Sequence, residues 1–472
     1  MTDAAMLTAT ELLDLYRAHR LSPVEATRAA LDRIARDNAV VNAFSLVDEE
    51  GALAAARESE RRWQAGRPIG RLDGVPASVK ELLLARGWPT RRGSLTIDPD
   101  QPWEHDAPSV ARLREHGAVL LGMTTTPERG WKGVTDSPLT GITRNPWNTD
   151  TTPGGSSGGA AVAAALGMGA LHIGTDGGGS IRIPAAFTGV FGLKPTYGRV
   201  PAWPLSPFGD VSHLGPITRS VADAALMLTV LSEPDARDWQ ALPPDRRDWR
   251  VGLDDGVHGL RIAWSPAFGG AVVDPEVAEI AAAAAAAFGE LGAEVVREDP
   301  EIEPTHEIFR RIWYSGAVGA LAGIPEERRA DIDPGLAEIA REGAAIPHVD
   351  HLEAGLARGR LGLAMSLFLD RYDLLLTPAL PIPAFAAGRE VPDGSGMRRW
   401  TEWTRFSYPF NLTQQPAASV PCGLTAAGLP VGLQIVGPRH GEALVLRAAR
   451  AFEARHPFAF PGEPRTPGRS PA

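Results

Sequence analysis

The stretch TPGGSSGGAAVAAALGMGALHIGTDGGGSIRIP, residues 152–184, contains two serine sites next to glycines. Glycines lie on both sides of one site and before the other. The first site is Ser156 with Ser157, the second is Ser180, and an alanine-rich run separates them. Glycine lets a backbone approach a ligand closely. We therefore expect the run to fold as a helix and a strand that bring two candidate nucleophiles together, while the rest of the chain supplies a base and a substrate pocket.

The bulk composition is that of a globular protein with a large core. The 472 residues are 44% hydrophobic and 22% charged, with a formal net charge of −10. This charge argues against nucleic acid or an anionic membrane as the main partner. The one cysteine, Cys422, excludes an internal disulfide and a cysteine-based metal site. The first residues lack the basic start and apolar segment of a signal peptide, so we expect a cytoplasmic protein.

Helical and strand-like patterns alternate along the chain. Thr8 and Ser22 each precede a glutamate by three residues, which is the spacing of a capping box, and residues 1–65 are expected to be helical. Residues 72–80 alternate as a short strand that ends at Lys80. The pattern predicts an α/β/α sandwich with a mixed, mostly parallel central β-sheet that helices cover on both faces. We expect one domain over residues 1–472, comprising N-terminal helices (1–70), a catalytic core (71–231), a more variable substrate-pocket region (232–405) and a C-terminal core strand and helix (406–472).

Two nucleotide-binding interpretations of the opening stretch fail on its residues. A phosphate-binding loop requires Lys and then Ser or Thr after the second glycine, but Ala160 and Ala161 follow Gly159. A dinucleotide fingerprint requires a third glycine after Gly167 and Gly169, where the chain has His172.

A serine hydrolase of the nucleophile-elbow type is a third interpretation. Residues 154–158, GGSSG, match GxSxG in form, and this class needs an acid and a histidine later in the chain. His440 near Glu442 is the available pair. The pattern is short and arises readily by chance in a glycine-rich protein.

The whole stretch, with further segments in the same order along most of the chain, resembles the amidase signature family. The segments that carry the resemblance are GVPASVKELLLARGWPTRRGS (74–94), TRNPWN (143–148), TPGGSSGG (152–159), GTDGGGSIRIP (174–184), GVFGLKPTYGR (189–199), LGPITRSVADAA (214–225), YPFNLTQQPAASVPCG (408–423) and GLPVGLQIVGP (428–438).

The resemblance implies a Ser–cis-Ser–Lys triad. It places the nucleophile on Ser180, the bridging serine after a cis peptide bond on Ser156, and the general base on Lys80. It implies an oxyanion hole formed by backbone N–H groups and a supporting role for residues around the nucleophile. The oxyanion-hole residues are Gly177, Gly178, Gly179 and Ser180, and the supporting residues are Ser157, Asp176 and Arg182, of which the last two are expected to form a structural ion pair.

The chemistry of each side chain agrees with its implied role. A serine hydroxyl is a weak nucleophile until a base takes its proton. Lysine acts as that base near neutral pH only where burial lowers its pKa. The hydroxyl of Ser156 both donates and accepts, so it is suited to relay a proton between Ser180 and Lys80. No metal or organic cofactor is required.

We therefore expect an amidase that hydrolyses the C–N bond of a carboxamide through an acyl-Ser180 intermediate. The partner is a small amide-type molecule, the enzyme is a monomer or homodimer, and similar enzymes often also take anilides, esters or carbamates. One alternative is the glutamine-hydrolysing A subunit of the tRNA-dependent amidotransferase, although loop 124–138 departs from the Ser-rich segment of that protein. Another is a non-catalytic binding protein. Aromatic side chains that are candidates to line the pocket are Trp131, Trp313, Tyr314, Trp400 and Trp403.

Overall fold

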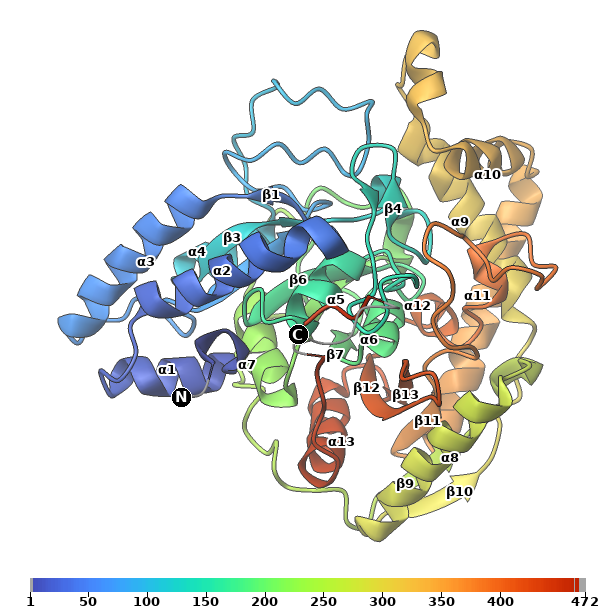
Figure 1. Cartoon of the computed structure of the whole chain (residues 1–472). Coiled ribbons are helices and arrows are strands. Elements are labelled where there is room, and N and C mark those ends of the chain that lie inside the picture. The colour runs from blue at the N-terminus through green and yellow to red at the C-terminus, as the bar shows by residue number, and fades with distance from the viewer. Residues whose placement is uncertain (1–2, 462, 467–472) are drawn as a thin grey trace.

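The structure is a computed structural model that describes residues 3–461 and 463–466. In this part of the chain, an eleven-stranded sheet runs through the molecule (Figure 1). Its strands in spatial order are β1 (Phe44–Val47), β3 (Val119–Thr124), β2 (Pro76–Lys80), β6 (Leu171–Asp176), β8 (His213–Thr218), β7 (Phe191–Lys194), β12 (Ala417–Leu424), β13 (Pro430–Val436), β11 (Leu374–Pro378), β9 (Arg261–Trp264) and β10 (Glu294–Arg297). A separate hairpin pairs β4 (Asp136–Ser137) with β5 (Gly141–Ile142).

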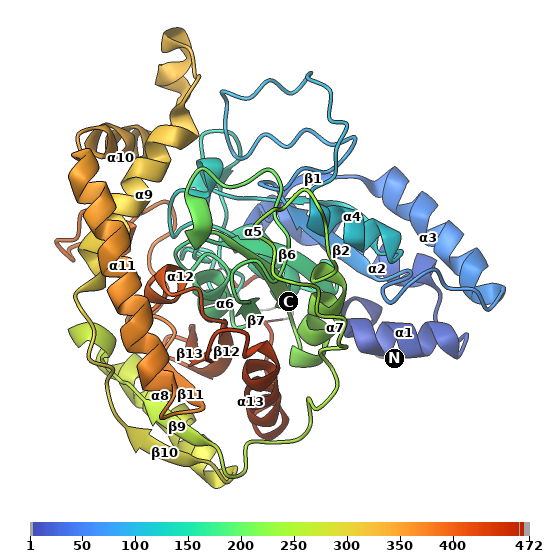
Figure 2. The same ribbon diagram turned by 180° about the vertical axis from the view of Figure 1, so that it is seen from behind.

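Helices cover both faces of this sheet, as predicted. One face carries α1 (Ala9–Arg17), α4 (Pro108–Glu115), α7 (Val221–Leu231), α8 (Pro275–Glu290) and α13 (Glu442–Arg455). The other carries α2 (Pro23–Val41), α3 (Glu49–Gln64), α5 (Gly158–Ala165), α6 (Arg182–Thr188) and the short α12 (Pro409–Leu412). In the view from behind, α9 (Thr305–Leu321), α10 (Pro334–Ala344) and α11 (His348–Leu369) stack together at one side (Figure 2).

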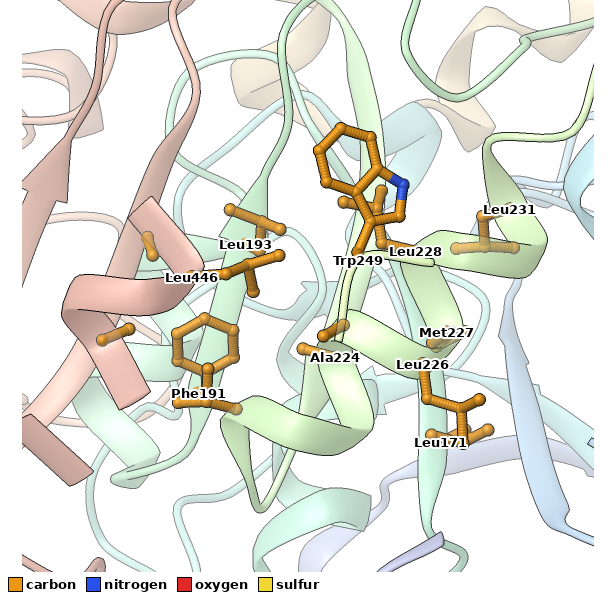
Figure 3. Close-up of a cluster of buried hydrophobic side chains, with 14 of the residues drawn as sticks. Leu171, Phe191, Leu193, Ala224, Leu226, Met227, Leu228, Leu231, Trp249 and Leu446 are labelled. Carbon is orange, nitrogen blue, oxygen red and sulfur yellow. The ribbon is translucent and has the colours of Figure 1, made fainter. Parts of the chain in front are cut away.

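The strands alternate their side chains between two separate cores. On β3, Leu120 packs into the core beneath α7, whereas Val119 and Leu121 pack beneath α2 on the opposite face. Figure 3 shows the first of these cores, where Phe191 of β7 lies among leucines of the sheet and of α7. Because both faces are buried, the central strands read as continuous apolar runs.

The sheet is mixed, as predicted, but the prediction that it is mostly parallel is wrong. Of the ten strand pairings in the described residues, four are parallel and six are antiparallel. A parallel pair needs a long crossover, usually a helix, whereas an antiparallel pair needs only a turn. The turn at residues 425–429 joins β12 directly to β13, and no helix longer than a single 3₁₀ turn lies between β7 and β8 in the described chain.

Some of the predicted helices and strands are confirmed by the structure, and others differ from it. The capping boxes at Thr8 and Ser22 are present and start α1 and α2. Residues 1–65 were expected to be helical, but β1 interrupts them as an edge strand beside β3. The strand expected over 72–80 begins only at Pro76 and ends at Lys80, as the alternation indicated. Strand β12 was not predicted from the sequence.

Candidate active site

Parallel pairing of β2 with β6 brings Lys80 to the serine-containing stretch. Lys80 is the last residue of β2, and Thr175 lies near the end of β6, which pairs with β2 at Val79 and Ile173. The carboxyl ends of neighbouring parallel strands meet at one edge of a sheet, where α/β folds place their sites. Ser156 and Ser157 reach the same edge just before α5 begins.

The Lys80 side chain is fully buried and surrounded by hydroxyl groups. Its Nζ lies 2.6 Å from Ser156 Oγ, 2.8 Å from Ser157 Oγ and 2.9 Å from Thr175 Oγ1. Within residues 3–461 and 463–466, no carboxylate forms an ion pair with it. Burial therefore lowers the pKa of Lys80 well below its ordinary value, against a smaller opposing effect of Asp176.

The two serine sites face one cavity. Ser156 follows a cis peptide bond with Gly155, and both Ser156 and Ser180 line the cavity. Ser157 connects the two sites, because its N–H donates to Ser180 O at 3.1 Å and its hydroxyl donates to Thr175 O at 3.1 Å. In the described part of the chain, the hydroxyls of Ser156 and Ser180 form no direct hydrogen bond with each other.

The glycine turn before Ser180 offers three of the four predicted backbone donors. Gly179 N–H donates to Asp176 Oδ1 at 2.7 Å, so this donor is occupied, contrary to its predicted place in an oxyanion hole. The N–H groups of Gly177, Gly178 and Ser180 have no acceptor among the residues that the structure describes. Gly179 has φ +123°, and a Cβ there would lie 2.5 Å from Ser407 Oγ, so the turn requires glycine at this position.

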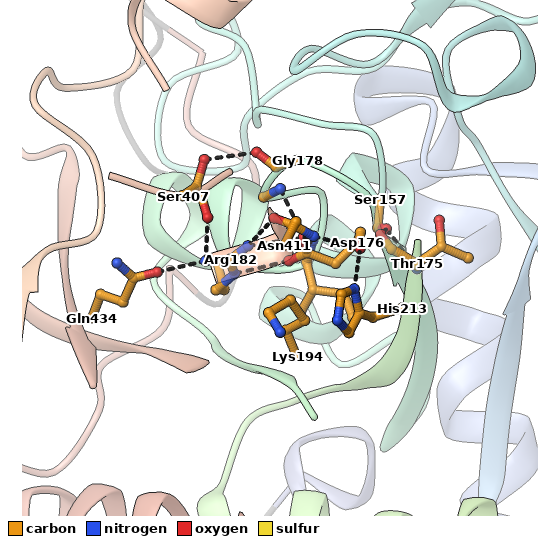
Figure 4. A network of polar contacts seen from close by, with 12 residues as sticks. Ser157, Thr175, Asp176, Gly178, Arg182, Lys194, His213, Ser407, Asn411 and Gln434 are labelled. Carbon is orange, nitrogen blue, oxygen red and sulfur yellow. Dashed lines mark hydrogen bonds and ion pairs between the residues drawn. The ribbon is translucent and has the colours of Figure 1, made fainter. Parts of the chain in front are cut away.

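Asp176 and Arg182 form the predicted ion pair, which is fully buried at the base of this turn (Figure 4). Arg182 donates twice to the Asp176 carboxylate, at 3.0 Å from both Nε and Nη2. Burial would raise the pKa of Asp176, but the charge and hydrogen bonds of Arg182 outweigh it and hold that pKa below its ordinary value. The remaining guanidinium N–H groups donate to Asn411 Oδ1 at 2.7 Å, Gln434 Oε1 at 2.7 Å and Ser407 O at 2.8 Å.

Sequence reasoning missed several residues that shape this site. Thr175 lies inside the GTDGGGS segment, but nothing in the sequence indicated that its hydroxyl would contact Lys80. Asn411 lies in the quoted 408–423 segment and donates to the backbone and carboxylate of Asp176, each at 2.8 Å. His213 also lines the cavity, and burial, aided by the charge of Lys194, lowers its pKa well below the ordinary value.

The cavity has a volume of about 360 Å³ and opens over the two serines. Its walls come mainly from residues 82–84 after β2, from the loop 202–212 before β8 and from the first two residues of β8. The apolar side chains of Leu82, Trp203 and Phe208 line it. This volume is within the range for small-molecule sites.

Among the five aromatic residues predicted for the pocket, Trp313 alone lines this cavity in the described structure. Trp131, Tyr314, Trp400 and Trp403 are instead buried in the core around α9. Trp400 packs under the glycine turn, where a Cβ at Gly178 would lie 2.8 Å from its ring. Trp400 thus supports the turn from behind, because the glycine leaves space there for a large ring.

The nucleophile-elbow alternative is not supported. Ser156 contacts Lys80, whereas Glu442 accepts hydrogen bonds from Thr196 N and Arg199 Nε. His440 and Ser156 form no contact within residues 3–461 and 463–466. In the same residues, no three His, Cys, Asp or Glu side chains are grouped as metal ligands, and no helix is long and apolar enough to cross a membrane.

Comparison with known proteins assigns the family. The sequence profile of the Amidase family matches residues 25–446. The chain belongs to the amidase signature family. It is an amidohydrolase that acts on the C–N bond of carboxamides.

Other members of the amidase signature family resemble the chain over almost its full length. An acylamidase of Rhodococcus erythropolis is 39% identical, with 96% of each chain covered. The A subunit of the glutamyl-tRNA(Gln) amidotransferase of Myxococcus xanthus is 38% identical, with 97% of this chain and 98% of that protein covered. A bacterial aryl acylamidase structure superposes with a TM-score of 0.89 at 34% identity, covering 96% of both chains.

Proposed function

We propose that this amidase works through an acyl-enzyme on Ser180, with Ser156 as a proton relay and Lys80 as the general base. The observation that carries the proposal is the uncompensated burial of Lys80 against the hydroxyl of Ser156. A lysine with a lowered pKa is neutral more often near neutral pH and accepts a proton.

The hydrogen bonds around Lys80 fit a neutral amine. A neutral amine has two N–H donors and one lone pair, and Nζ has three hydroxyl neighbours. The Ser157 hydroxyl already donates to Thr175 O, so it accepts from Lys80. Thr175 Oγ1 is the second acceptor. In the proposed neutral form, Nζ has no third N–H for Ser156, so its lone pair accepts from the Ser156 hydroxyl, which lies 2.6 Å away.

The reaction then follows in balanced steps. Ser180 Oγ bonds to the substrate carbonyl carbon while its proton passes to Ser156 Oγ, whose own proton passes to Lys80 Nζ. The reverse transfer protonates the leaving nitrogen when the C–N bond breaks, and the amine departs. Water then attacks the ester by the same route and releases the acid. The hydrogen bond from Ser180 to Ser156 is expected to form with substrate, because catalytic hydrogen bonds often tighten only in the substrate complex.

The N–H groups of Gly177, Gly178 and Ser180 form the proposed oxyanion hole. They lie on one four-residue turn, on which Gly179 N–H is already bonded to Asp176. One such donor contributes about 3–4 kcal/mol to transition-state stabilisation in comparable enzymes. Asp176 and Arg182 hold the turn in place and touch no reacting atom. Ser157 joins the two serine sites and also accepts a hydrogen bond from Lys80 Nζ, the proposed base.

The proposed substrates are small N-substituted amides, including anilides, with esters and carbamates or urethanes as further candidates. The apolar walls of the cavity, including Leu82 and Phe208, suit such groups. Relatives described as acylamidase and aryl acylamidase support this choice. We further propose that the chain acts as one cytoplasmic domain, as a monomer or homodimer, on small molecules.

A second candidate is glutamine hydrolysis within a tRNA-dependent amidotransferase. The 38% identity to the A subunit of such an enzyme favours it. Glutaminase activity that appears only after the other components of the amidotransferase are added would support this candidate, whereas hydrolysis of anilides by the isolated chain supports the first.

The test is hydrolysis of a panel of amides, anilides, carbamates and glutamine by the purified chain. Ser180→Ala serves as the blank, and Ser366→Ala, an exposed serine on α11, serves as the matched control. We expect anilide hydrolysis that Ser180→Ala abolishes and Ser366→Ala retains. Undiminished hydrolysis by Ser180→Ala would refute the assignment of the nucleophile.

A further inference from the structure

Two arginines line the cavity, and neither forms an ion pair with a carboxylate in the part of the chain that the structure describes. Arg92 and Arg129 are both part of the cavity wall. The Arg92 side chain forms no hydrogen bond or ion pair in the part of the chain that the structure describes. Arg129 donates from Nη2 to Thr96 Oγ1 at 3.2 Å, and its buried Nε has no partner in that same part.

The surroundings of Arg92 and Arg129 contain more positive than negative charge. Burial lowers the pKa of Arg92, and the neighbouring charge of Arg129 lowers it further. The acid beside Arg129 is Glu128, whose two carboxylate oxygens already accept from Ser94 Oγ and from Asp333 N. Burial lowers the pKa of Arg129, and the charge of Glu128 partly opposes this effect. Arginine stays protonated even so, and one carboxylate balances at most one of the two guanidinium groups. This wall of the cavity therefore keeps a net positive charge in a protein of net charge −10.

The backbone holds both arginines in an uncommon conformation. Arg92 has φ 56° and Arg129 has φ 53°, in the left-handed region that residues other than glycine seldom adopt. A backbone hydrogen bond links the two segments that carry these arginines, because Arg129 N–H donates to Arg92 O at 2.7 Å. Such conformations concentrate at binding and catalytic sites, where the surroundings enforce them.

The pair lies beside the catalytic serines. Gly130 directly follows Arg129, and a Cβ at Gly130 would lie 3.4 Å from Ser156 Oγ. Arg129, Gly130, Ser156 and Ser180 all line the same cavity. A substrate whose carbonyl reaches Ser180 therefore lies in a cavity that both arginines line.

We propose that Arg92 and Arg129 bind a carboxylate of the substrate, so that the enzyme selects amides that carry an anionic group. Arginine binds a carboxylate with two parallel hydrogen bonds, which gives strength and fixed orientation. This inference rests on the proposed function, because it names the substrate class of that same cavity. Leu82 and Phe208 then accommodate the apolar part of such a substrate.

Matched substrate pairs test the selection. One pair is succinic acid mono-4-nitroanilide against the 4-nitroanilide of 4-oxopentanoic acid, in which a methyl ketone replaces the carboxylate on the acyl side. The other is 4-acetamidobenzoate against 4-acetamidoacetophenone, which differ on the amine side. We expect kcat/KM to favour the carboxylate at least tenfold in one pair. No preference in either pair would overturn the inference.

Variants then assign the preference to the two arginines. Arg92→Gln and Arg129→Gln should each lower the ratio of kcat/KM for the carboxylate over its neutral partner at least tenfold. Arg92→Lys, which keeps the charge but loses the two-bond geometry, should fall between Arg92→Gln and the wild type. Arg389→Gln, on an exposed loop, is the control and should leave the ratio unchanged. An unchanged ratio in both glutamine variants would overturn the inference.

A binding measurement separates this inference from the proposed mechanism. The Ser180→Ala variant should bind the succinic mono-anilide at least tenfold more tightly than the ketone analogue in calorimetry, and Arg92→Gln added to it should remove the difference. Selective binding without any hydrolysis by the wild type keeps the inference and refutes the mechanism. Hydrolysis of the neutral anilide without selective binding refutes the inference and keeps the mechanism.

Discussion

The basic side chains of Lys80 and Arg182 are both fully buried near the glycine turn, and their surroundings differ in one respect. Arg182 is paired with the carboxylate of Asp176, whereas Lys80 has hydroxyl groups around it. The two sets of contacts begin at adjacent residues of β6, because Thr175 contacts Lys80 and Asp176 contacts Arg182. Successive residues of a strand point to opposite sides, which separates the two environments.

The difference determines what each cation does. Arg182 is held by its ion pair with Asp176, and its hydrogen bonds to Asn411 and Gln434 join the turn to the C-terminal part of the sheet. Without such a pair, burial lowers the pKa of Lys80 and makes it a base. One cation thus serves the structure and the other the chemistry.

The largest expected effect is on activity, from Lys80→Met. This variant should lower kcat/KM by about 10²–10⁴-fold, the usual contribution of a general base, while the protein stays folded. Steady-state hydrolysis and the thermal midpoint measure the two quantities. The matched control is Lys132→Met, since Lys132 is a buried lysine paired with Asp136 and Asp333. The control should lose stability and keep turnover, and equal losses of turnover in both variants would remove the distinction.

The next effect is on stability, from Arg182→Met. Removing one partner of a buried ion pair costs about 3–5 kcal/mol, because the other charge is left uncompensated. Urea denaturation measures this cost. The double variant with Asp176→Asn should cost less than the sum of the single variants. A cost below about 1 kcal/mol for Arg182→Met would contradict a structural role for this pair.

The residues of the Lys80 cluster were predictable from the sequence, but some of its contacts were not. Strand alternation placed Lys80 at a strand end, and the resemblance placed Ser156 and Ser180 beside it, so the residues of the cluster were predictable. Contacts made across long separations were not. Nothing local in the sequence shows that Thr175 would contact Lys80, or that Asn411 would reach Asp176 across 235 positions.

The aromatic residues and the sheet show the same limit. Trp400 and Trp403 carry no sequence signal that separates a pocket wall from a core. The space beside Gly133, which both rings fill, places them in the core. The strands of the sheet and the helices on both of its faces were predictable from the periodicity of apolar residues. Strand directions were not, because they depend on which turns replace crossovers, as between β12 and β13.

A smaller effect is on pH dependence, from Thr175→Val. Thr175 Oγ1 accepts from Lys80 Nζ, and such an acceptor favours the ammonium form. Its removal should lower the pKa of Lys80 further. Since the neutral amine is the active form, the acidic limb of kcat/KM should shift to lower pH, by up to about one unit for a hydrogen bond of about 1 kcal/mol. A shift to higher pH would contradict the role of Lys80 as a neutral base.

The smallest expected effect comes from Ser407→Ala. The single O–H of Ser407 is shared between two carbonyl acceptors, Gly178 O at 2.7 Å and Thr404 O at 2.9 Å, and it stabilises the glycine turn on the side of Arg182. Its loss should cost about 1 kcal/mol of unfolding free energy. Turnover should fall less than about threefold, which is well under 1 kcal/mol of transition-state stabilisation. A loss of activity as large as that of Lys80→Met would mean that the two regions act as one.

The most direct test of Lys80 as the base for Ser180 is the pH dependence of covalent labelling by a fluorophosphonate. The account predicts an adduct on Ser180, mapped by peptide mass spectrometry, that forms faster as pH rises through a single ionisation below the ordinary pKa of lysine. Lys80→Met should slow the labelling and remove this ionisation. An adduct on Ser156, or an unchanged labelling profile in Lys80→Met, would contradict the account.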